Sequence, residues 1–121
     1  MKRILLCDDD VDLLDLCAAI FKFKGWDVCC KNNCRQILSD IEEYKPDVIL
    51  MDNRIPDTGG IKAIQLIKNT VQFKNIPVIF FSANSGIREL AKEAGTDYIL
   101  QKPFDLRDLE KVIIAATQTK I

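Results

Sequence analysis

The chain has 121 residues, a length typical of a single domain with one hydrophobic core. Its 17 Lys and Arg residues nearly balance 18 Asp and Glu residues, so the net charge of −1 offers no positive field for nucleic acid, and we expect no direct binding to it. The apolar run after the basic start is too short for a signal peptide, and no run is long enough to span a membrane, which predicts a cytoplasmic protein without membrane contact.

The cysteine pattern argues against a metal site or a disulfide framework. Five cysteines occur at positions 7, 17, 29, 30 and 34, without a Cys-x-x-Cys pair and without any histidine in the chain. Free cysteines in a reducing compartment usually behave as small buried hydrophobes. We therefore expect Cys7, Cys17 and one member of the Cys29–Cys30 pair to be buried.

The chain opens with a predicted strand and a predicted helix. Residues 4–7 form a short apolar run, after which Asp10 or Asp12 can cap a helix whose apolar residues recur at helical spacing. Gly25 is a residue type that often ends helices. The first helix is therefore predicted over residues 11–24.

A second strand and a second helix follow. Residues 26–31 form a strand that is more polar than the other predicted strands, which favours a place at the edge of a sheet. Asn32 or Asn33 can cap the next helix. That helix is expected to end at Lys45, because Pro46 disfavours a helical residue before it.

The middle of the chain predicts a strand, a loop, a helix and a further strand. Residues 48–51 are an apolar run, and residues 53–59 contain turn-forming Pro and Gly. Isoleucines at helical spacing over residues 61–67 predict the third helix. A second fully apolar run, residues 78–81, predicts the fourth strand, and such runs suit a sheet that is covered on both faces.

The last part of the chain predicts a helix, a strand and a final helix. A fourth helix is predicted over residues 86–94, with Gly95 as its stop, and a fifth strand over residues 98–101. Asp105 can cap the last helix. The residues expected to point inward from that helix are Leu106, Leu109, Val112, Ile113 and Ala116.

Polar residues stand where the four apolar strands end. They are the acidic run at 8–10 after the first strand, Asp52 after the third, Ser82 after the fourth and Lys102 after the fifth. Alternating strands and helices predict an α/β fold with five parallel strands and helices on both faces of the sheet. The carboxyl ends of such strands meet at one crevice, where open α/β sheets bind ligands.

The spacing of these residues resembles the receiver domain of two-component response regulators over residues 1–121. That family has an acidic pair after the first strand, and an aspartate after the third with Pro four residues later. Ser or Thr follows the aspartate by thirty residues, and Lys-Pro-Phe follows it by fifty. The matching residues here are Asp8, Asp9, Asp52, Pro56, Ser82 and Lys102-Pro103-Phe104. The resemblance implies the strand order 2-1-3-4-5 of a doubly wound, flavodoxin-like sheet.

The resemblance also implies a role for each acidic residue. Asp52 corresponds to the phosphate acceptor, since an Asp carboxylate can form an acyl phosphate. Asp9 corresponds to a direct Mg²⁺ ligand and Asp8 to a ligand through water, with Asp52 and the backbone carbonyl of Arg54 as further ligands. Three carboxylates in one pocket repel one another, and Mg²⁺, which prefers carboxylates, waters and phosphate oxygens, relieves that repulsion. Asp10 is expected to cap the first helix and to stay outside the site.

The remaining site residues are assigned in the same way. Lys102 supplies a positive charge to the transferred phosphoryl group, and the family geometry implies a cis Lys102–Pro103 bond. The hydroxyl of Ser82 is expected to move toward the phosphoryl oxygens on activation. The side chains of Arg54 and Asn84 are expected to line the mouth of the site.

Two positions depart from the family pattern. An aromatic residue three positions before the lysine normally turns inward behind the strand-four hydroxyl, but that position is Ile99 here and the aromatic residue is Tyr98. Because side chains alternate along a strand, Tyr98 should point away from Ile99 and pack on a helix or lie at the surface. Gly59 replaces a frequent acid, with an effect expected only on the loop.

These residues predict a signalling switch and not an enzyme. The domain is expected to take a phosphoryl group from a sensor histidine kinase or phosphotransfer protein, to assist its own phosphorylation and dephosphorylation, and to change its surface around helix four, strand five and helix five. The chain stops soon after Asp105, so it is expected to carry no output domain: it is a stand-alone regulator or the amino-terminal receiver of a longer transcription factor or kinase. The alternatives are a haloacid dehalogenase-like phosphatase, which needs a second acid where Arg54 stands, and a flavodoxin-like cofactor binder, disfavoured by the acids after strand one.

Overall fold

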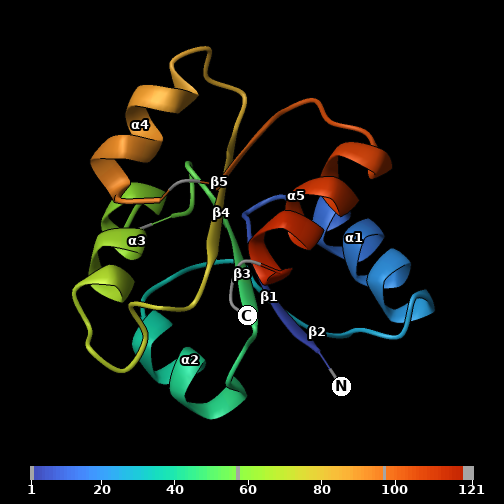
Figure 1. Cartoon of the computed structure of the whole chain (residues 1–121), viewed down its shortest axis with the longest axis horizontal. Coiled ribbons are helices and arrows are strands. Elements are labelled where there is room, and N and C mark those ends of the chain that lie inside the picture. The colour runs from blue at the N-terminus through green and yellow to red at the C-terminus, as the bar shows by residue number, and fades with distance from the viewer. Residues whose placement is uncertain (1, 57, 97, 119–121) are drawn as a thin grey trace.

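The computed structural model describes residues 2–56, 58–96 and 98–118, so Met1 and residues 119–121 of the predicted domain lie outside the described residues. In chain order the elements are β1 (Arg3–Cys7), α1 (Val11–Phe23), β2 (Asp27–Lys31), α2 (Ile37–Tyr44), β3 (Val48–Asp52), α3 (Gly60–Lys68), β4 (Val78–Ser82), α4 (Ile87–Ala94), β5 (Tyr98–Gln101) and α5 (Leu106–Gln118). The five strands are parallel and lie in the order β2-β1-β3-β4-β5 (Figure 1). The predicted α/β class, strand order and edge position of β2 are confirmed.

Two apolar layers hold helices against the two faces of the sheet. Alternate strand residues such as Leu5, Ile49 and Phe80 pack toward α2, α3 and α4, and their neighbours, such as Ile4 and Leu50, pack toward α1 and α5 (Figure 1). Each fully buried aliphatic or aromatic side chain of this kind contributes about 1.5–3 kcal/mol. Because β1, β3 and β4 are covered on both faces, they are apolar at nearly every position.

Several predicted helix ends are confirmed. The carboxylate of Asp10 accepts a hydrogen bond from the Leu13 N–H at 3.1 Å and caps α1. Asp105 Oδ1 accepts from the Asp108 N–H at 2.9 Å, as expected for the cap of α5. Gly95 ends α4 in the left-handed conformation with φ of 92°.

The start of α2 was predicted wrongly. The helix begins at Ile37, and no side chain of its cap residue, Gln36, bonds to the first turn. Asn33 Oδ1 instead accepts from the Arg35 N–H at 3.1 Å, so this asparagine stabilises a turn before the helix. The helix ends at Tyr44, next to the expected position.

Two burial predictions also need correction. Cys7 and Cys17 are buried as expected, but neither member of the Cys29–Cys30 pair is, because both lie on the edge strand β2; Cys34 is buried instead. Leu106 is 40% exposed and not inward, since it lies on the first turn of α5 and faces a groove toward α1.

Close packing at the start of α3 requires a glycine. A Cβ atom on Gly60 would collide with the carbonyl oxygen of Asp52 and stand 2.9 Å from Asn53 Cα, and the Gly60 N–H donates to Asn53 O at 3.0 Å. Gly59 before it has φ of 82° and ψ of 149°, a backbone region that is essentially restricted to glycine. The glycine at position 59 therefore has a defined backbone role, beyond the loop effect expected from sequence.

We predict that Gly60→Ala destabilises the fold by about 1–3 kcal/mol, because the added methyl group overpacks against backbone that cannot move independently of β3. Urea unfolding followed by circular dichroism measures this. Gly86→Ala is the matched control, since its Cβ would meet only flexible side-chain atoms, those of Asn84 at 3.3 Å and Glu89 at 3.9 Å. Equal stability of the Gly60→Ala variant and the unmodified chain would contradict the close-packing argument.

Candidate functional site

The predicted site residues meet at the carboxyl ends of four strands. Asp8 and Asp9 follow β1, Asp52 ends β3, Ser82 ends β4 and Lys102 follows β5. Backbone hydrogen bonds extend the sheet past these ends. The N–H groups of Asp8, Asn53 and Lys102 donate to carbonyls on β2, β4 and β4, at 3.1, 3.1 and 2.9 Å. The sheet therefore fixes where the side chains begin.

The ammonium group of Lys102 lies between two buried carboxylates. Its Nζ donates to Asp8 Oδ2 at 2.9 Å and to Asp52 Oδ1 at 3.0 Å. The other oxygen of each carboxylate accepts from a backbone N–H, Asp10 N for Asp8 and Arg54 N for Asp52, both at 3.0 Å. Each carboxylate thus accepts one hydrogen bond from the Lys102 ammonium and one from a backbone N–H.

Burial and the ion pairs have opposite effects on the pKa values of Asp8 and Lys102. Burial raises the pKa of Asp8 and the charge of Asp52 adds to that rise, while hydrogen bonds from the Asp10 N–H and Lys102 oppose it; the net pKa lies above the usual value. Burial lowers the pKa of Lys102, but its bonds to Asp8 and Asp52 outweigh burial and leave the pKa raised. Lys102 is therefore charged at neutral pH.

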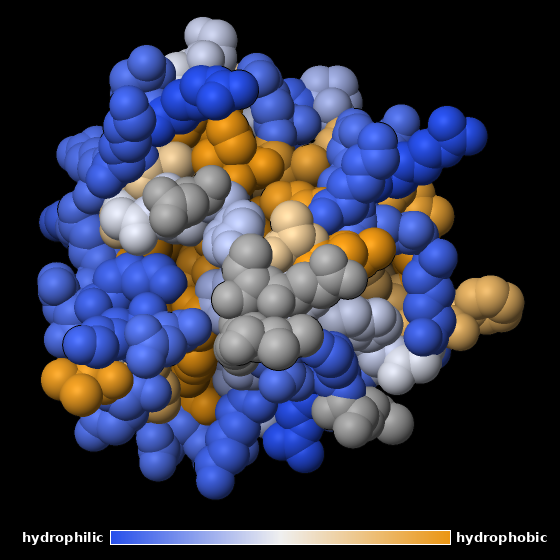
Figure 2. All heavy atoms as spheres, viewed as in Figure 1, coloured by the Kyte–Doolittle hydropathy of each residue, from blue (hydrophilic) through white to orange (hydrophobic). Residues whose placement is uncertain are grey.

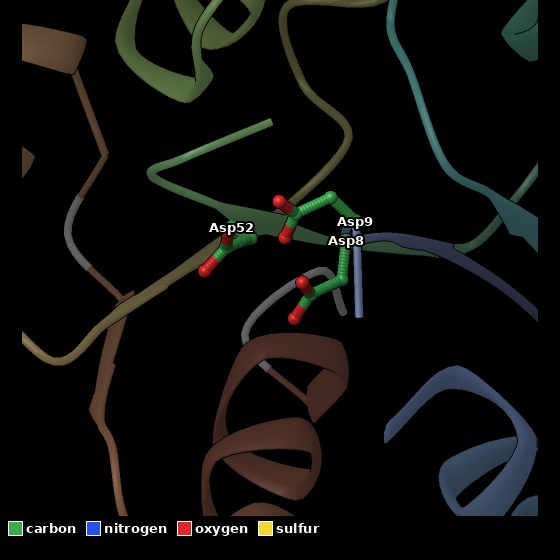
Figure 3. Close-up of side chains that lie close together, drawn as sticks. All are labelled: Asp8, Asp9 and Asp52. Carbon is green, nitrogen blue, oxygen red and sulfur yellow. The ribbon is translucent and has the colours of Figure 1, made fainter. Parts of the chain in front are cut away.

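Three carboxylates form a cluster beside Lys102. Ligand oxygens of Asp8, Asp9 and Asp52 all lie within 4.8 Å of one another, and Asp9 is exposed whereas the other two are buried (Figure 3). Hard oxygen donors from carboxylates at this separation fit Mg²⁺, which keeps waters among its ligands and needs few protein groups. Exposure of Asp9 leaves one side of the cluster open to such waters.

The other residues that the sequence placed at or near the site lie as follows. Ser82 is buried, and its Oγ accepts from the Asn84 N–H at 3.0 Å. Arg54 touches Asp52 through its backbone N–H. The Lys102–Pro103 bond is cis, as the resemblance implied. Asp10 caps α1 and is not part of the carboxylate cluster, as expected.

The displaced aromatic residue lies on the opposite face of β5 from Ile99. Ile99 packs with the α3 and α4 layer, whereas Tyr98 packs with the layer that includes Leu109 and Ile113 of α5. The prediction that the two side chains point apart is confirmed. Position 99, where the family pattern has an aromatic side chain, therefore carries an aliphatic one on the α3 and α4 face of the sheet.

Sequence reasoning missed an aromatic contact at Lys102. The Lys102 Nζ lies 4.9 Å from the ring centroid of Phe81, and that ring meets Phe104 edge-on at 6.3 Å. A cation above an aromatic face is stabilised by the ring quadrupole. The successive pair Phe80–Phe81 gave a signal, but only the register of β4 decides which ring faces the lysine.

Comparison with known proteins gives the family. Residues 4–114 match the family described as the response regulator receiver domain. The chain therefore belongs to the response regulator receiver family.

Curated relatives are mostly longer proteins. The regulatory protein AtoC of Escherichia coli is 34% identical over 122 residues, which cover 98% of this chain and 26% of that protein. The sensor kinase/phosphatase CqsS of Vibrio cholerae is 31% identical, and the match covers 86% of this chain and 16% of that protein. The chain thus spans about a quarter or less of these two relatives.

Solved structures agree with the fold. The receiver domain of the sensor histidine kinase PA1611 from Pseudomonas aeruginosa is 28% identical with a TM-score of 0.87, covers 97% of this chain and 98% of that one, and is described with a magnesium ion in its active site cleft. The Vibrio cholerae chemotaxis protein CheY4, 21% identical with a TM-score of 0.87 over 96% of this chain and 98% of that one, shows the same fold.

The family assignment also bears on the two alternative functions. Membership of the receiver family gives no support to a haloacid dehalogenase-like phosphatase or a flavodoxin-like cofactor binder, and Arg54 stands where the phosphatase needs an acid. Among residues 2–56, 58–96 and 98–118, no helix combines the length and apolarity needed to cross a membrane.

We predict that Lys102→Met, measured without divalent metal, lowers the free energy of unfolding by about 3 kcal/mol, because two buried carboxylates lose their counter-ion. Without the ammonium the folded-state pKa of Asp8 rises further above its unfolded value. The loss of unfolding free energy in Lys102→Met should therefore shrink as pH falls and grow as pH rises. Urea unfolding between pH 5 and 8 tests this.

Two further variants sharpen that measurement. Lys102→Met combined with Asp8→Asn should recover most of the lost stability, since one of the two charges is gone. Lys111→Met is the control, because Lys111 is exposed and its loss should change the unfolding free energy by less than about 0.5 kcal/mol. A Lys102→Met protein as stable as the unmodified chain at pH 8 would disprove the bridging role.

Proposed function

We propose that residues 1–121 act as one receiver domain in which Asp52 accepts a phosphoryl group. The observation that carries this proposal is the placement of Asp52, buried at the end of β3, with one oxygen on Lys102 and carboxylates beside it. A carboxylate oxygen forms a bond to phosphorus while the bond from phosphorus to the donor breaks and the donor leaves with the electron pair. The product is an acyl phosphate on Asp52.

Lys102 prepares the site for the added charge. Its ammonium offsets one of the two negative charges of Asp52 and Asp8 before transfer, and after transfer it stands within reach of the phosphoryl oxygens. Phosphoryl transfer depends mainly on positioning and charge neutralisation, and the two carboxylates and the Phe81 ring hold the ammonium in place. Lys102 is therefore the group that offsets the negative charge gained at Asp52.

Magnesium completes the proposed chemistry. Asp8, Asp9, Asp52 and the backbone carbonyl of Arg54 are the groups that would hold the ion. When bound, Mg²⁺ supplies positive charge to the oxygens of the phosphoryl group. The carboxylate cluster and the magnesium described for the Pseudomonas aeruginosa relative support this assignment.

The switch is proposed to run through Ser82. Its hydroxyl, bonded to the Asn84 N–H in this structure, moves toward the phosphoryl oxygens and releases the loop that leads to α4. Ile99 fills the space behind it by a rotamer change, but an aliphatic side chain cannot exchange hydrogen bonds as a tyrosine would. The surface around α4, β5 and α5 then changes and signals to a partner.

The proposed place of the domain is a cytoplasmic phosphorelay. A sensor histidine kinase or a phosphotransfer protein is the donor, and the domain assists its own phosphorylation and dephosphorylation without acting as an enzyme on a separate substrate. The matched relatives include transcriptional regulators and a sensor kinase, so the domain serves either alone or as the receiver of such a longer protein.

Asp52→Asn should abolish phosphoryl uptake while the fold is kept, because the amide oxygen can still accept from the Arg54 N–H but cannot form an acyl phosphate. Intact mass after incubation with Mg²⁺ and a small acyl phosphate measures uptake, and chelation of Mg²⁺ should prevent it in the unmodified chain. Asp10→Asn is the control, since Asn caps α1 equally well and uptake should persist. Incorporation into the Asp52→Asn protein would disprove the assignment.

Ser82→Ala should strongly reduce the change in amide hydrogen exchange over residues 83–101 that phosphorylation produces, because the loop loses its link to the phosphoryl group. Tyr98→Ala should alter that change little, since Tyr98 packs on the opposite side of the sheet from Ile99. Exchange is compared with and without beryllium fluoride and Mg²⁺. Loss of the response in Tyr98→Ala with its retention in Ser82→Ala would refute this route.

A further inference from the structure

Three sulfur atoms from three separate segments meet in the core. Cys7 ends β1, Met51 lies opposite Cys7 in the parallel register of β3, and Cys34 lies in the loop between β2 and α2. The Cys34 thiol donates to Met51 Sδ at 3.6 Å, and the Cys7 thiol is hydrogen-bonded to the Cys34 thiol. We call these three residues the three-sulfur cluster.

The fold encloses the three-sulfur cluster. Its residues are at most 2% exposed and belong to the apolar layer that packs toward α2, α3 and α4. In the view of Figure 2, the surface where α2 lies in Figure 1 is mainly hydrophilic. Cys29 packs against the same layer from the edge strand β2 and is only half-buried. A ligand of the cluster would therefore enter past Cys29 or the loop before α2.

The donor atoms of the three-sulfur cluster suit a soft metal ion. Thiolates and thioethers select Cu(I), whereas Mg²⁺ takes oxygen ligands and structural zinc takes four ligands, mostly cysteine and histidine. Two sulfurs bonded to one ion at about 2.3 Å lie about 3.8–4.0 Å apart when the angle at the ion is tetrahedral or trigonal. The 3.6 Å between Cys34 Sγ and Met51 Sδ is close to this separation. A displacement of a few tenths of an ångström would seat an ion between them.

We propose that the three-sulfur cluster binds one Cu(I) ion through Cys7 Sγ, Cys34 Sγ and Met51 Sδ. Each bond from a cysteine sulfur to the ion forms as the S–H bond breaks, and the proton passes to solvent. The thioether of Met51 donates a lone pair, and the oxidation state of the ion does not change. Strand pairing and the loop before α2 bring these ligands together without a Cys-x-x-Cys motif. The site does not depend on the proposed phosphorylation of Asp52.

The position of the three-sulfur cluster links it to the carboxylates of the candidate functional site. Cys7 and Met51 directly precede Asp8 and Asp52 in the chain. Because side chains alternate along a strand, the sulfurs face the α2, α3 and α4 layer while the two carboxylates meet Lys102. Bound Cu(I) would therefore join the loop before α2 to the two strands that carry Asp8 and Asp52.

Binding is measured by anaerobic titration of the reduced chain with Cu(I), supplied as its acetonitrile complex, against a coloured Cu(I) chelator. One ion per chain should bind, and X-ray absorption at the copper edge should show only sulfur neighbours. Excess Mg²⁺ should leave the ion bound, because Mg²⁺ prefers oxygen ligands. Amide hydrogen exchange of the loaded chain should slow over residues 31–38 and stay unchanged over α1.

Variants locate the ion. Cys34→Ala should weaken Cu(I) binding about 100-fold or more, because loss of groups that only support metal ligands already costs about 10–100-fold. Met51→Leu keeps the core volume nearly constant and should weaken binding about tenfold, the lower end of that range. Cys17→Ala is the matched control, since Cys17 is also a buried thiol but packs in the layer of α1 and α5, and its loss should leave the affinity unchanged. Circular dichroism verifies that each variant is folded.

Three results would overturn the proposal. The first is an unmodified chain that does not compete with the chelator, and the second is a bound ion with oxygen or nitrogen neighbours only. The third is unchanged affinity in folded Cys34→Ala together with loss of binding in Cys30→Ala, which would place the ion on the exposed thiol of β2. If Cys34→Ala does not fold, unchanged affinity in Met51→Leu overturns the proposal in its place.

Discussion

The position of one ammonium group between two buried carboxylates governs this site. Burying a carboxylate without a partner costs several kcal/mol, so Asp8 and Asp52 can be packed at neighbouring strand ends only because Lys102 reaches both. Asp8 follows β1, Asp52 ends β3 and Lys102 follows β5, so the three residues are far apart in sequence. The ion pairs therefore form only when the whole sheet is in register, and fold and site depend on each other.

The backbone around Asp52 is constrained as tightly as its charge. Asp52 accepts from the Arg54 N–H two residues later, and the start of α3 approaches so closely that only glycine fits at position 60. Gly59 before it takes a backbone conformation that is also restricted to glycine. These contacts fix the carboxylate direction from the loop side, while Lys102 fixes it from the sheet side. In the proposed function, a carboxylate held in this way needs little rearrangement when a phosphoryl donor arrives.

The two helical layers cover opposite faces of the sheet and pack different residues of β5. The layer of α2, α3 and α4 includes the aliphatic side chain of Ile99, so in the proposed switch the coupling from the site toward α4 depends on the Ser82 hydroxyl and its loop. The layer of α1 and α5 includes Tyr98 on the inside, and Leu16 and Phe23 of α1 are exposed on its outside. The proposed signal surface of α4, β5 and α5 therefore includes one helix from each layer.

The sequence alone determined the alternation of strands and helices, the caps at Asp10 and Asp105, and the meeting of Asp8, Asp9, Asp52 and Lys102 at one edge, because period, turn residues and spacing are local signals. Only the tertiary structure decided that Phe81 lies under Lys102, that Cys34 and not Cys29 or Cys30 is buried, and that Asn33 forms a turn before α2. The Phe81 and cysteine outcomes depend on strand register and on which edge a strand occupies, and both are set by contacts between residues distant in the chain. The Asn33 turn is a local alternative to a helix cap, and asparagine side chains form both.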